Sequence, residues 1–403
     1  MNIIFLTMSP IRSVDEGGIF SDLMSKFFDE GHSVTIVSPL ERKNGKPTNI
    51  VDKGRLKYLN VHTLNLIKAN VVEKGIGQIL VEGQYKRAIR KYIGKEKYDL
   101  ILYSTPPITL LGVVKYLKIK NPKAVSYLLL KDIFPQNAVD IGMFGKNSLF
   151  YKYFRKKEKA LYLQSDFIGC MSPANVDFVL KHNPEINANR VEVAPNSVKL
   201  SKDRAYCVQR RIEEVRNKYG LPTDKPVFIY GGNLGRPQGI PFFVRCLDGS
   251  KNRTDCHFLV VGSGTEQHLI QTWYDTAEPA NVTVLKALPK VDYDMLVQTC
   301  DAGLIFLDHR FTIPNFPSRL LSYLEYKMPV ICATDPNCDM GPIAETNGFG
   351  YWCESNSVED FSNCIDKLLN ADMKAMGEKG YKFLCDNYCV ENTFDTIMEH
   401  IKQ

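Results

Sequence analysis

Residues 314–332 read Pro-Asn-Phe-Pro-Ser-Arg-Leu-Leu-Ser-Tyr-Leu-Glu-Tyr-Lys-Met-Pro-Val-Ile-Cys, and this stretch carries three structural signals in succession. Its first four residues are rich in proline, which predicts a loop over Pro314–Pro317. Leucines at helical spacing follow Ser318, which stands at the position of a helix cap. Pro329 ends that helix, and the apolar residues after it open a buried strand. The stretch therefore predicts the loop, helix and strand of an α/β fold.

The start of this predicted helix suits an anionic ligand. The first turn of a helix has free backbone N–H groups and a partial positive charge. Arg319 lies in that turn and adds a forked donor that matches phosphate. An ordinary connection with a surface arginine would give the same pattern, so both interpretations stay open at this point.

Short apolar segments alternate with helical periods through the rest of the chain. Strands are predicted in the first half at 3–6, 33–37, 99–103, 125–130, 167–171 and 191–193. They are predicted in the second half at 226–230, 257–261, 282–285, 303–307, 330–333 and 350–353. Such strands favour parallel sheets covered by helices on both faces. We therefore expect an α/β fold with two doubly wound Rossmann-like domains facing a cleft, and ligands beyond the carboxyl ends of the strands.

Length and charge agree with two domains. A chain of 403 residues suits about two domains of roughly 200 residues each. Residues 1–200 carry a net charge of +12 and residues 201–403 a net charge of −6. A basic half joined to an acidic half indicates that the first domain faces a polyanion or an anionic membrane.

Signals for export, membrane spanning and metal binding are missing from the sequence. Residues 1–7 lack the basic start and the long apolar core of a signal peptide. The apolar run 100–117 is interrupted by two prolines and is too short to span a bilayer. The 11 cysteines show no metal-ligand spacing with histidine, which indicates reduced thiols in a cytoplasmic protein.

The segment Lys146–Leu163 is rich in both aromatic and basic residues. A helix of this composition can lie in the surface of an anionic membrane. A solvated helix whose aromatic side chains face the core fits the sequence equally well.

Glycines follow the predicted strands at Gly17-Gly18, at Gly231 to Gly235 and at Gly262 to Gly264. Glycine lets the backbone approach a ligand closely and expose its amides to phosphate, although ordinary turns need glycine too. Arg236 follows the second set and could hold a diphosphate leaving group, or could be an exposed loop residue.

Two further segments carry carboxylates. Asp132 follows the strand at 125–130, where it could orient or deprotonate an acceptor hydroxyl or serve as a loop residue or cap. Asp292-Tyr293-Asp294 has a metal-binding form, but its position predicts the acidic first turn of a helix, so we expect no metal. The Gly-x-Gly-x-x-Gly fingerprint is absent after the first strand, which argues against an oxidoreductase.

Taken together, these segments resemble the family 4 retaining glycosyltransferases of the GT-B fold, in particular those that build bacterial O-antigen and capsule repeat units. The resemblance covers nearly the whole chain and does not specify a sugar. Its motifs are Gly17-Gly18 with Gly31–Val37, Ser104–Pro107, Lys131–Val139, Ala194–Asn196, Gly232–Gly239, Val261–Gly264 and the opening stretch.

The resemblance implies an acceptor-binding domain at 1–200 and a nucleotide-sugar-binding domain at 201–387, with a C-terminal helix at about 388–403 crossing back onto the first. It implies front-face attack, in which the departing phosphate takes the acceptor's proton and the protein supplies preorganised positive charge. The catalytic candidates are Asp132, Arg236 and Arg319. The donor-binding candidates are Gly232, Asn233, Gln238, Gly262, Gly264, Arg310, Ser318, Ser322 and Glu325, and the acceptor-binding candidates are Gly17, Gly18 and Asn196.

The chain departs from the family pattern at several of these positions. Many members carry two glutamates where this sequence has Pro314 and Ser322. Glu325 lies one turn beyond Ser322 and could replace the second glutamate from the same helical face. The family's usual arginine and lysine fall on Asn233 and Gln238, so Arg236, Arg310 or Arg319 must supply the positive charge.

The sequence thus predicts a metal-independent hexosyltransferase without a cofactor, using a nucleotide-sugar donor that is UDP-linked or similar. The sugar would be an N-acetylated hexose or a deoxyhexose, and the acceptor a saccharide on a polyprenyl diphosphate. We expect peripheral association with the anionic inner face of the cytoplasmic membrane, and no nucleic acid partner. A non-catalytic partner subunit, favoured by Pro314 and Ser322, and a nucleotide-sugar epimerase are the alternatives.

Overall fold

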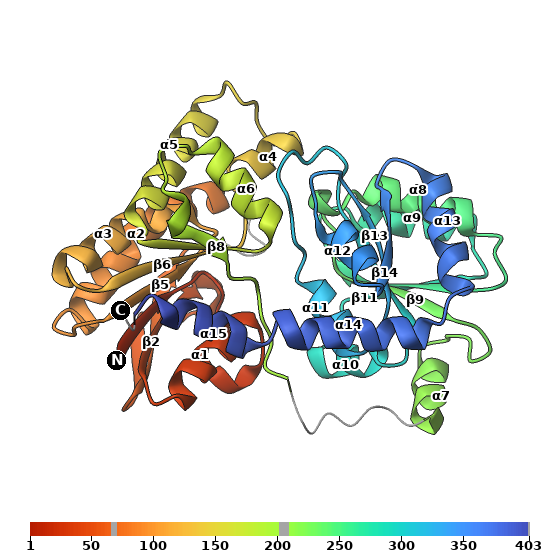
Figure 1. Cartoon of the computed structure of the whole chain (residues 1–403), viewed down its shortest axis with the longest axis horizontal. Helices are drawn as coiled ribbons and strands as arrows, with labels where there is room; N and C mark the ends of the chain where they lie inside the picture. Colours follow the sequence, from red (N-terminus) through yellow and green to blue (C-terminus); the bar gives the residue numbers. More distant parts are fainter. Residues whose placement is uncertain (66–70, 201–208, 402–403) are drawn as a thin grey trace. The chain divides into compact units, whose positions relative to one another are not determined.

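A computed structural model describes residues 1–65, 71–200 and 209–401 of the chain (Figure 1). The chain divides into two units. Unit 1 comprises Met1–Lys199 together with Cys389–Gln403, and unit 2 comprises Leu200–Tyr388. Each unit has its own parallel sheet, so the predicted α/β class with two doubly wound domains is confirmed. The functions predicted for the two domains, and the cleft between them, stay predictions.

The sheet of unit 1 has the strand order β3-β4-β2-β1-β5-β6-β7-β8. Its described pairs are parallel except for β3 and β4, which pair antiparallel. Strand β5 is buried throughout and β6 is buried except at Val125, because helices cover both faces of such a sheet. The strands are β1 (Asn2–Leu6), β2 (Ser33–Glu41), β3 (Asn49–Lys53), β4 (Leu56–Thr63), β5 (Leu100–Ser104), β6 (Val125–Leu130), β7 (Phe167–Cys170) and β8 (Val191–Val193).

The helices of unit 1 include the last helix of the chain, α15. α15 packs beside α1 (Figure 1), and the rings of Phe27 and Phe394 lie 4.9 Å apart at their centroids. The Thr393 hydroxyl also donates to the carbonyl of Pro195 at 3.3 Å. The helices are α1 (Ile19–Asp29), α2 (Val71–Tyr92), α3 (Leu111–Lys120), α4 (Gln136–Asp140), α5 (Leu149–Gln164), α6 (Pro173–His182) and α15 (Val390–Glu399).

The sheet of unit 2 has the order β11-β10-β9-β12-β13-β14, and its described pairs are parallel. Counted from β9, this is the 3-2-1-4-5-6 order of a Rossmann fold, in which ligands bind where the order reverses. That point lies between β9 and β12. The strands are β9 (Val227–Asn233), β10 (His257–Ser263), β11 (Val282–Lys286), β12 (Ala302–Phe306), β13 (Val330–Thr334) and β14 (Gly350–Glu354).

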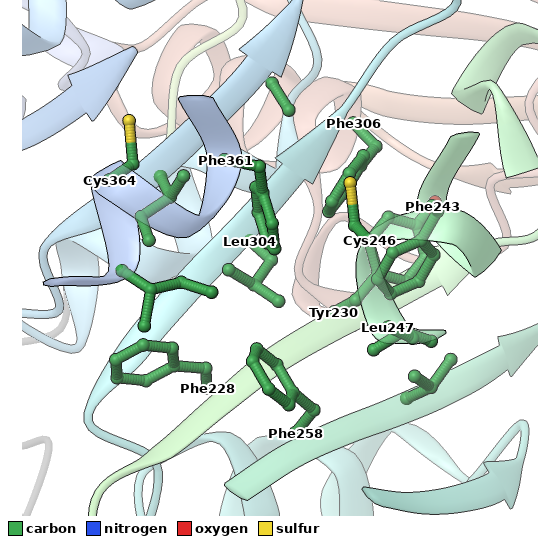
Figure 2. Packing of buried hydrophobic residues seen from close by; sticks show 14 of the residues in the cluster. Phe228, Tyr230, Phe243, Cys246, Leu247, Phe258, Leu304, Phe306, Phe361 and Cys364 are labelled. Atoms are coloured by element: carbon green, nitrogen blue, oxygen red, sulfur yellow. The ribbon is translucent and has the colours of Figure 1, made fainter. Parts of the chain in front are cut away.

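The core of unit 2 is strongly aromatic on one face of this sheet. Figure 2 shows Phe228, Phe258 and Phe306, which come from three different strands, packed with residues from the helices above them. Phe243 packs against Phe306 with ring centroids 4.3 Å apart. The helices are α7 (Gln209–Lys218), α8 (Ile240–Ser250), α9 (Gln267–Ala277), α10 (Lys290–Val297), α11 (Arg319–Glu325), α12 (Met340–Thr346), α13 (Val358–Leu369) and α14 (Met373–Asn387).

The structure differs from the sequence-based expectations at two places. The lysine-rich stretch before residue 65 forms the antiparallel pair β3 and β4, which we did not predict. Strand β2 continues to Glu41, beyond the predicted end at residue 37. In the part of the chain that the structure describes, no helix combines the length and the apolar character needed to cross a bilayer.

Candidate functional site

The glycines of unit 2 let backbone segments meet at the carboxyl ends of β9 and β10. A β-carbon on Gly262 would overlap the carbonyl oxygen of Gly232, and one on Gly264 would overlap that of Leu234. Gly232 has φ +124°, a conformation that side chains rarely adopt. The predicted glycines Gly232, Gly262 and Gly264 therefore lie together at one edge of the sheet.

Arg319 lies beside this glycine turn, at the start of α11. Its Nη2 would be 3.4 Å from a β-carbon on Gly232, and its guanidinium carbon lies 4.3 Å from the centroid of the Tyr230 ring. The Nη1 atom of Arg319 is buried and has no hydrogen-bond partner. A buried donor of a charged group without a partner is costly, and an anion placed there would remove that cost.

Three tyrosines surround the Arg319 guanidinium, and the sequence analysis did not identify them. Burial opposes the charge, but the oxygens of Tyr230, Tyr323 and Tyr293 hold the pKa of Arg319 above its usual value. Gly303 lets the Tyr323 ring approach the sheet, and Tyr323 also accepts the N–H of Gly231 at 3.1 Å. Because the three tyrosines are far apart in the chain, the sequence pattern gave no signal for this cage.

The tyrosine in Asp292-Tyr293-Asp294 has a packing role. Its hydroxyl fills the space where Gly231 lacks a β-carbon. The two flanking carboxylates pair with lysines, Asp292 with Lys218 at 3.7 Å and Asp294 with Lys290 at 2.7 Å. Asp292 lies in the first turn of α10, as predicted. Within the described residues there is no cluster of three or more potential metal ligands among His, Cys, Asp and Glu.

Arg236 follows the same glycine turn and is loosely held. Its Nε lies 3.6 Å from Oε1 of Glu266, and its side chain is 58% exposed. Glu266 is much less exposed, and its Oε2 atom is buried without a hydrogen-bond partner. Arg236 can therefore move to an incoming anion at little cost.

Arg310, in contrast, is bound tightly within its own loop. Its Nε and Nη2 donate to the two carboxylate oxygens of Asp308 at 2.8 and 2.7 Å. This bidentate pair raises the pKa of Arg310, and despite burial it lowers the pKa of Asp308. Much of the positive charge of Arg310 is therefore already neutralised.

Asn233 and Gln238 hold the turn between them in shape. The Asn233 amide donates to Oε1 of Gln238 at 2.8 Å, and the N–H of Gly235 donates to the same oxygen at 3.3 Å. These two predicted donor-binding residues thus position the backbone on either side of Arg236.

The remaining donor candidates lie on or before α11, which has seven residues. Ser318 is at the predicted cap position, but its side chain makes no capping hydrogen bond. Ser322 and Glu325 are both partly buried, one helical turn apart. The predicted loop at Pro314–Pro317 and the strand after Pro329 are both present.

In unit 1, Asp132 lies directly after β6, as expected. Its Oδ1 accepts a hydrogen bond from the Asn137 amide at 2.8 Å, and Asn137 Oδ1 is buried without a partner. Burial raises the pKa of Asp132 to about 6, while the Asn137 hydrogen bond lowers it. A carboxylate that titrates near neutral pH suits proton transfer.

Lys131, beside Asp132, is a partly buried cation that the sequence analysis did not select. Its Nζ donates to the carbonyl of Ala194 at 2.8 Å, which links the end of β6 to the segment after β8. Burial lowers the pKa of this ammonium to about 7. The acceptor candidate Asn196 follows in the same segment and is itself buried.

The acceptor candidates Gly17 and Gly18 lie at the start of α1, with φ +70° and +133°. The N–H of Gly18 donates to Oδ1 of Asp22 at 3.1 Å. The structure thus divides the predicted residues into a cationic, glycine-rich edge in unit 2 and an edge with a titratable carboxylate in unit 1.

The predicted aromatic and basic helix is α5, which begins at Leu149. Phe154 and Tyr162 face the core, but Leu149, Phe150 and Tyr153 are 82%, 66% and 45% exposed. The buried Phe154 and Tyr162 agree with the interpretation of a helix whose aromatic side chains face the core, and the membrane interpretation stays a prediction.

Comparisons with known proteins agree with this geometry. The family described as "Glycosyl transferases group 1" matches residues 211–383. The chain is 22% identical to "Probable glycosyltransferase WbjE" of Pseudomonas aeruginosa over 379 residues, 92% of this chain and 90% of that protein. It is also 22% identical over 178 residues to "Putative colanic acid biosynthesis glycosyl transferase WcaI" of Escherichia coli, 43% of this chain and 42% of that protein.

Solved structures share the fold over the full length. Sucrose-phosphate synthase from Thermosynechococcus elongatus superposes with a TM-score of 0.76 at 15% identity, covering 100% of this chain and 99% of that one. HepE from Anabaena, solved in complex with UDP, superposes with a TM-score of 0.69 at 12% identity, covering 100% of both chains.

Proposed function

Since residues 211–383 are a domain of the glycosyl transferases group 1 family, we propose that the chain transfers a sugar from a nucleotide-sugar donor in bacterial polysaccharide synthesis. The acceptor is a saccharide carried on a polyprenyl diphosphate of an O-antigen or capsule pathway. The names of the two relatives support a glycosyltransferase, and that of WcaI supports a polysaccharide product.

The observation that carries this proposal is the unpartnered Nη1 of Arg319. The Arg319 guanidinium lies next to Gly232, where the strand order of unit 2 reverses. A guanidinium with a spare donor at this place suits the diphosphate of a nucleotide-sugar.

Unit 2 would hold the donor. Arg319 binds the diphosphate from the tyrosine cage, and the glycines allow the phosphates to approach the backbone. Arg236 moves from Glu266 to the phosphate that becomes the leaving group. As the glycosidic bond breaks, this fixed positive charge stabilises the charge that develops on the phosphate. In this mechanism the arginines supply that positive charge, so we expect activity to persist in EDTA.

Unit 1 would hold the acceptor. Asp132 orients the acceptor hydroxyl, and Asn137 holds the carboxylate in place. In the front-face reaction that retains the anomeric configuration, the departing phosphate receives the hydroxyl proton. The exposed apolar side chains of α5 support a peripheral position at the inner face of the cytoplasmic membrane, where a lipid-linked acceptor resides.

The test is a calorimetric titration with UDP combined with transfer from radiolabelled donors to lipid-linked acceptors. We expect UDP to bind, and at 100 times its dissociation constant to stabilise the protein by about 2.7 kcal/mol. Radiolabel in the lipid fraction supports the proposal. Binding without transfer to any acceptor would instead indicate a non-catalytic partner, and epimerisation of the free donor would indicate an epimerase.

A further inference from the structure

The loop between β1 and α1 carries an arginine that is held by neutral groups. The Nη1 of Arg12 donates to the Ser38 hydroxyl at 2.9 Å and to Oδ1 of Asn60 at 2.8 Å. A longer contact of 3.4 Å joins Nη1 to the carbonyl of Ile11, and Nη2 donates to the carbonyl of Pro39 at 2.5 Å. Ser38 and Pro39 lie beyond the last residue of β2 that pairs with β1, so Arg12 lies at the carboxyl edge of this sheet.

Two buried polar side chains fix the direction of this guanidinium. Ser38 on β2 and Asn60 on β4 are both buried. The Asn60 amide donates to Oδ1 of Asn49 at 3.0 Å, which turns Oδ1 of Asn60 toward Arg12. The Ser38 hydroxyl also lies 3.3 Å from the carbonyl of Ile11 and ties the loop to β2. Because buried polar groups need hydrogen-bond partners, these strands hold Arg12 in one orientation.

Part of the guanidinium remains available to a ligand. A guanidinium has five N–H groups. The hydrogen bonds of Arg12 use Nη1 and one N–H of Nη2, which leaves Nε and the second N–H of Nη2. Donors on neighbouring nitrogens match two oxygens of a phosphate. Since Arg12 is an exposed residue, an anion from solvent can reach these donors.

The charge of Arg12 is only weakly compensated. Burial of part of the side chain lowers the pKa of Arg12, while Glu16 and Tyr85 act in the opposite direction. Glu16 binds the loop backbone, because its Oε1 accepts the N–H groups of Arg12 and Ser13 at 2.6 and 2.5 Å. Within the described residues Arg12 forms no ion pair with a carboxylate. An anion beside the guanidinium would supply the missing compensation.

The acceptor candidates of unit 1 lie at the same edge of the sheet. Gly17 and Gly18 end the loop that contains Arg12, and Asp132 follows β6. Strands β2 and β6 are separated by β1 and β5, so they lie three strand spacings, roughly 14 Å, apart. A sugar ring with an attached diphosphate spans a distance of this order. An acceptor whose hydroxyl lies at Asp132 can therefore present its diphosphate to Arg12.

We propose that Arg12 binds the diphosphate of the lipid-linked acceptor and so favours acceptors that carry a diphosphate over saccharides that lack one. The identity of this acceptor rests on the proposed function, whereas the binding of a diphosphate at Arg12 does not. The nucleotide-sugar donor has a diphosphate too, but we assign that one to Arg319 in unit 2. Arg12 is thus a binding and specificity residue, and it makes or breaks no bond.

The first test titrates the full chain with inorganic pyrophosphate in a calorimeter, with and without an excess of UDP. UDP fills the donor site, so that pyrophosphate then reports a second site. Arg12→Gln should bind pyrophosphate at least tenfold more weakly, because hydrogen bonds from a charged donor are lost. Glutamine keeps an amide donor for Ser38 or Asn60, and thermal melting checks that the fold is retained. Equal affinities in the wild type and in Arg12→Gln would overturn the proposal.

A second variant keeps Arg12 and neutralises its charge. In Asn60→Asp, a carboxylate takes the place of the amide that lies 2.8 Å from Nη1 and accepts the same hydrogen bond. The fold should be retained, because an ionic acceptor replaces a neutral one, while pyrophosphate should bind about tenfold more weakly. If Arg12 only held the loop in place, Asn60→Asp would bind pyrophosphate as the wild type does, and the proposal would fail.

Arg55→Gln is the matched control. Arg55 is also an exposed arginine of unit 1 held by neutral groups, with its Nη1 3.4 Å from the carbonyls of Phe28 and His32. It precedes β4 and therefore lies at the opposite, amino edge of the sheet. Its pyrophosphate affinity should stay within about twofold of the wild type. Equal losses in Arg12→Gln and Arg55→Gln would mean a general charge effect and would overturn the proposal.

Turnover kinetics distinguish the acceptor from the donor as the source of the diphosphate. With a lipid-linked acceptor, Arg12→Gln should raise KM for the acceptor about tenfold and leave KM for the donor unchanged. The ratio of kcat/KM between this acceptor and the same saccharide on an alkyl chain should also fall about tenfold. If Arg12→Gln weakened UDP binding as much as pyrophosphate binding, Arg12 would belong to the donor site and the proposal would be wrong.

The two proposals can fail separately. A wild type that binds pyrophosphate through Arg12 but transfers no sugar would contradict only the proposed function. A wild type that transfers sugar to lipid-linked acceptors, with the same KM for the acceptor in Arg12→Gln, would contradict only the role of Arg12.

Discussion

The carboxyl edges of the two sheets have the same topology and opposite chemistry. In unit 1 the first strand, β1, lies between β2 and β5. In unit 2 the first strand, β9, lies in the same way between β10 and β12. In unit 2 this edge gathers glycine backbone and Arg319. In unit 1 it carries Asp132, whose pKa burial raises to about 6. The fold therefore fixes where ligands bind, and the loop residues decide which ligands they are.

Burial is the physical origin of the difference. The Arg319 guanidinium stays charged because tyrosine oxygens and an aromatic face surround it. The Asp132 carboxyl, with the Asn137 amide as its side-chain partner, shifts toward the neutral form instead. One edge is thus suited to hold a permanent anion, and the other to exchange or orient a proton.

The largest effect is expected for the variant Arg319→Met, which tests whether the cationic edge of unit 2 takes part in the reaction. Methionine keeps an apolar chain over the Tyr230 ring but removes the charge and the unpartnered donor. We expect kcat to fall about 100- to 1,000-fold, as for loss of a donor that stabilises a developing anion. Stability without ligand should be unchanged or higher, because an unpartnered buried donor disappears. Turnover kinetics and thermal melting measure the two effects.

Arg245→Met provides the control for Arg319→Met. The Arg245 guanidinium also lies near an aromatic ring, 5.5 Å from the centroid of Phe242, but Arg245 is exposed. Its turnover should stay within about twofold of the wild type. If Arg319→Met transferred sugar at the wild-type rate, the cationic edge of unit 2 would have no part in the reaction.

A second change tests the backbone of the same edge. In Gly262→Ala, the new methyl group meets the carbonyl oxygen of Gly232, a backbone atom that cannot rotate away. We expect a loss of about 1–3 kcal/mol in the free energy of unfolding and weaker UDP binding. Gly142→Ala, at a glycine of unit 1 with open space around it but φ +74°, isolates the cost of backbone strain alone. Equal losses of UDP affinity in both variants would contradict a donor site at Gly262.

The sequence predicted the elements that make these edges better than the contacts within them. The alternation of apolar segments and helical periods located β6 with the observed bounds, because a buried parallel strand is a nearly continuous apolar run. The hairpin of β3 and β4 was missed because it lies in a lysine-rich stretch. One strand of that hairpin, β3, is half-buried or exposed, which weakens the apolar signal.

The sequence could not predict which of the candidate arginines is already paired with a carboxylate. Arg310 and Arg319 both follow the strand β12 and looked equivalent as phosphate ligands. Arg310 is neutralised by Asp308, two residues away, whereas Arg319 is caged by Tyr323 of its own helix and by two tyrosines from other elements. Such cages depend on contacts between segments tens of residues apart, which a single sequence does not reveal.

The raised pKa of Asp132 predicts how the activity depends on pH. If Asp132 acts as its carboxylate, kcat/KM for the acceptor should fall about tenfold per pH unit below pH 6, where the group becomes protonated. In Asn137→Ala, a hydrogen bond that lowers the pKa of Asp132 is lost, so the fall should begin at higher pH. Asp132→Asn should remove this pH dependence together with most of the activity. A profile that is the same in the wild type and in Asn137→Ala would exclude Asp132 as the titrating group.

The smallest changes in kcat/KM are expected for variants of Arg236 and Arg310, which differ in how they are paired. Arg236 is exposed and only loosely paired with Glu266, so Arg236→Ala removes a charge that is available to the donor. We expect kcat/KM to fall about tenfold, with unchanged thermal stability. Arg310→Ala removes a charge that Asp308 already neutralises, so its loss should be less than about threefold unless the freed Asp308 carboxylate repels the donor. The double variant Asp308→Asn/Arg310→Ala separates these two causes. Recovery in the double variant would mean that Arg310 acts by shielding Asp308, and a loss as large as that of Arg236→Ala would mean that Arg310 contacts the donor directly.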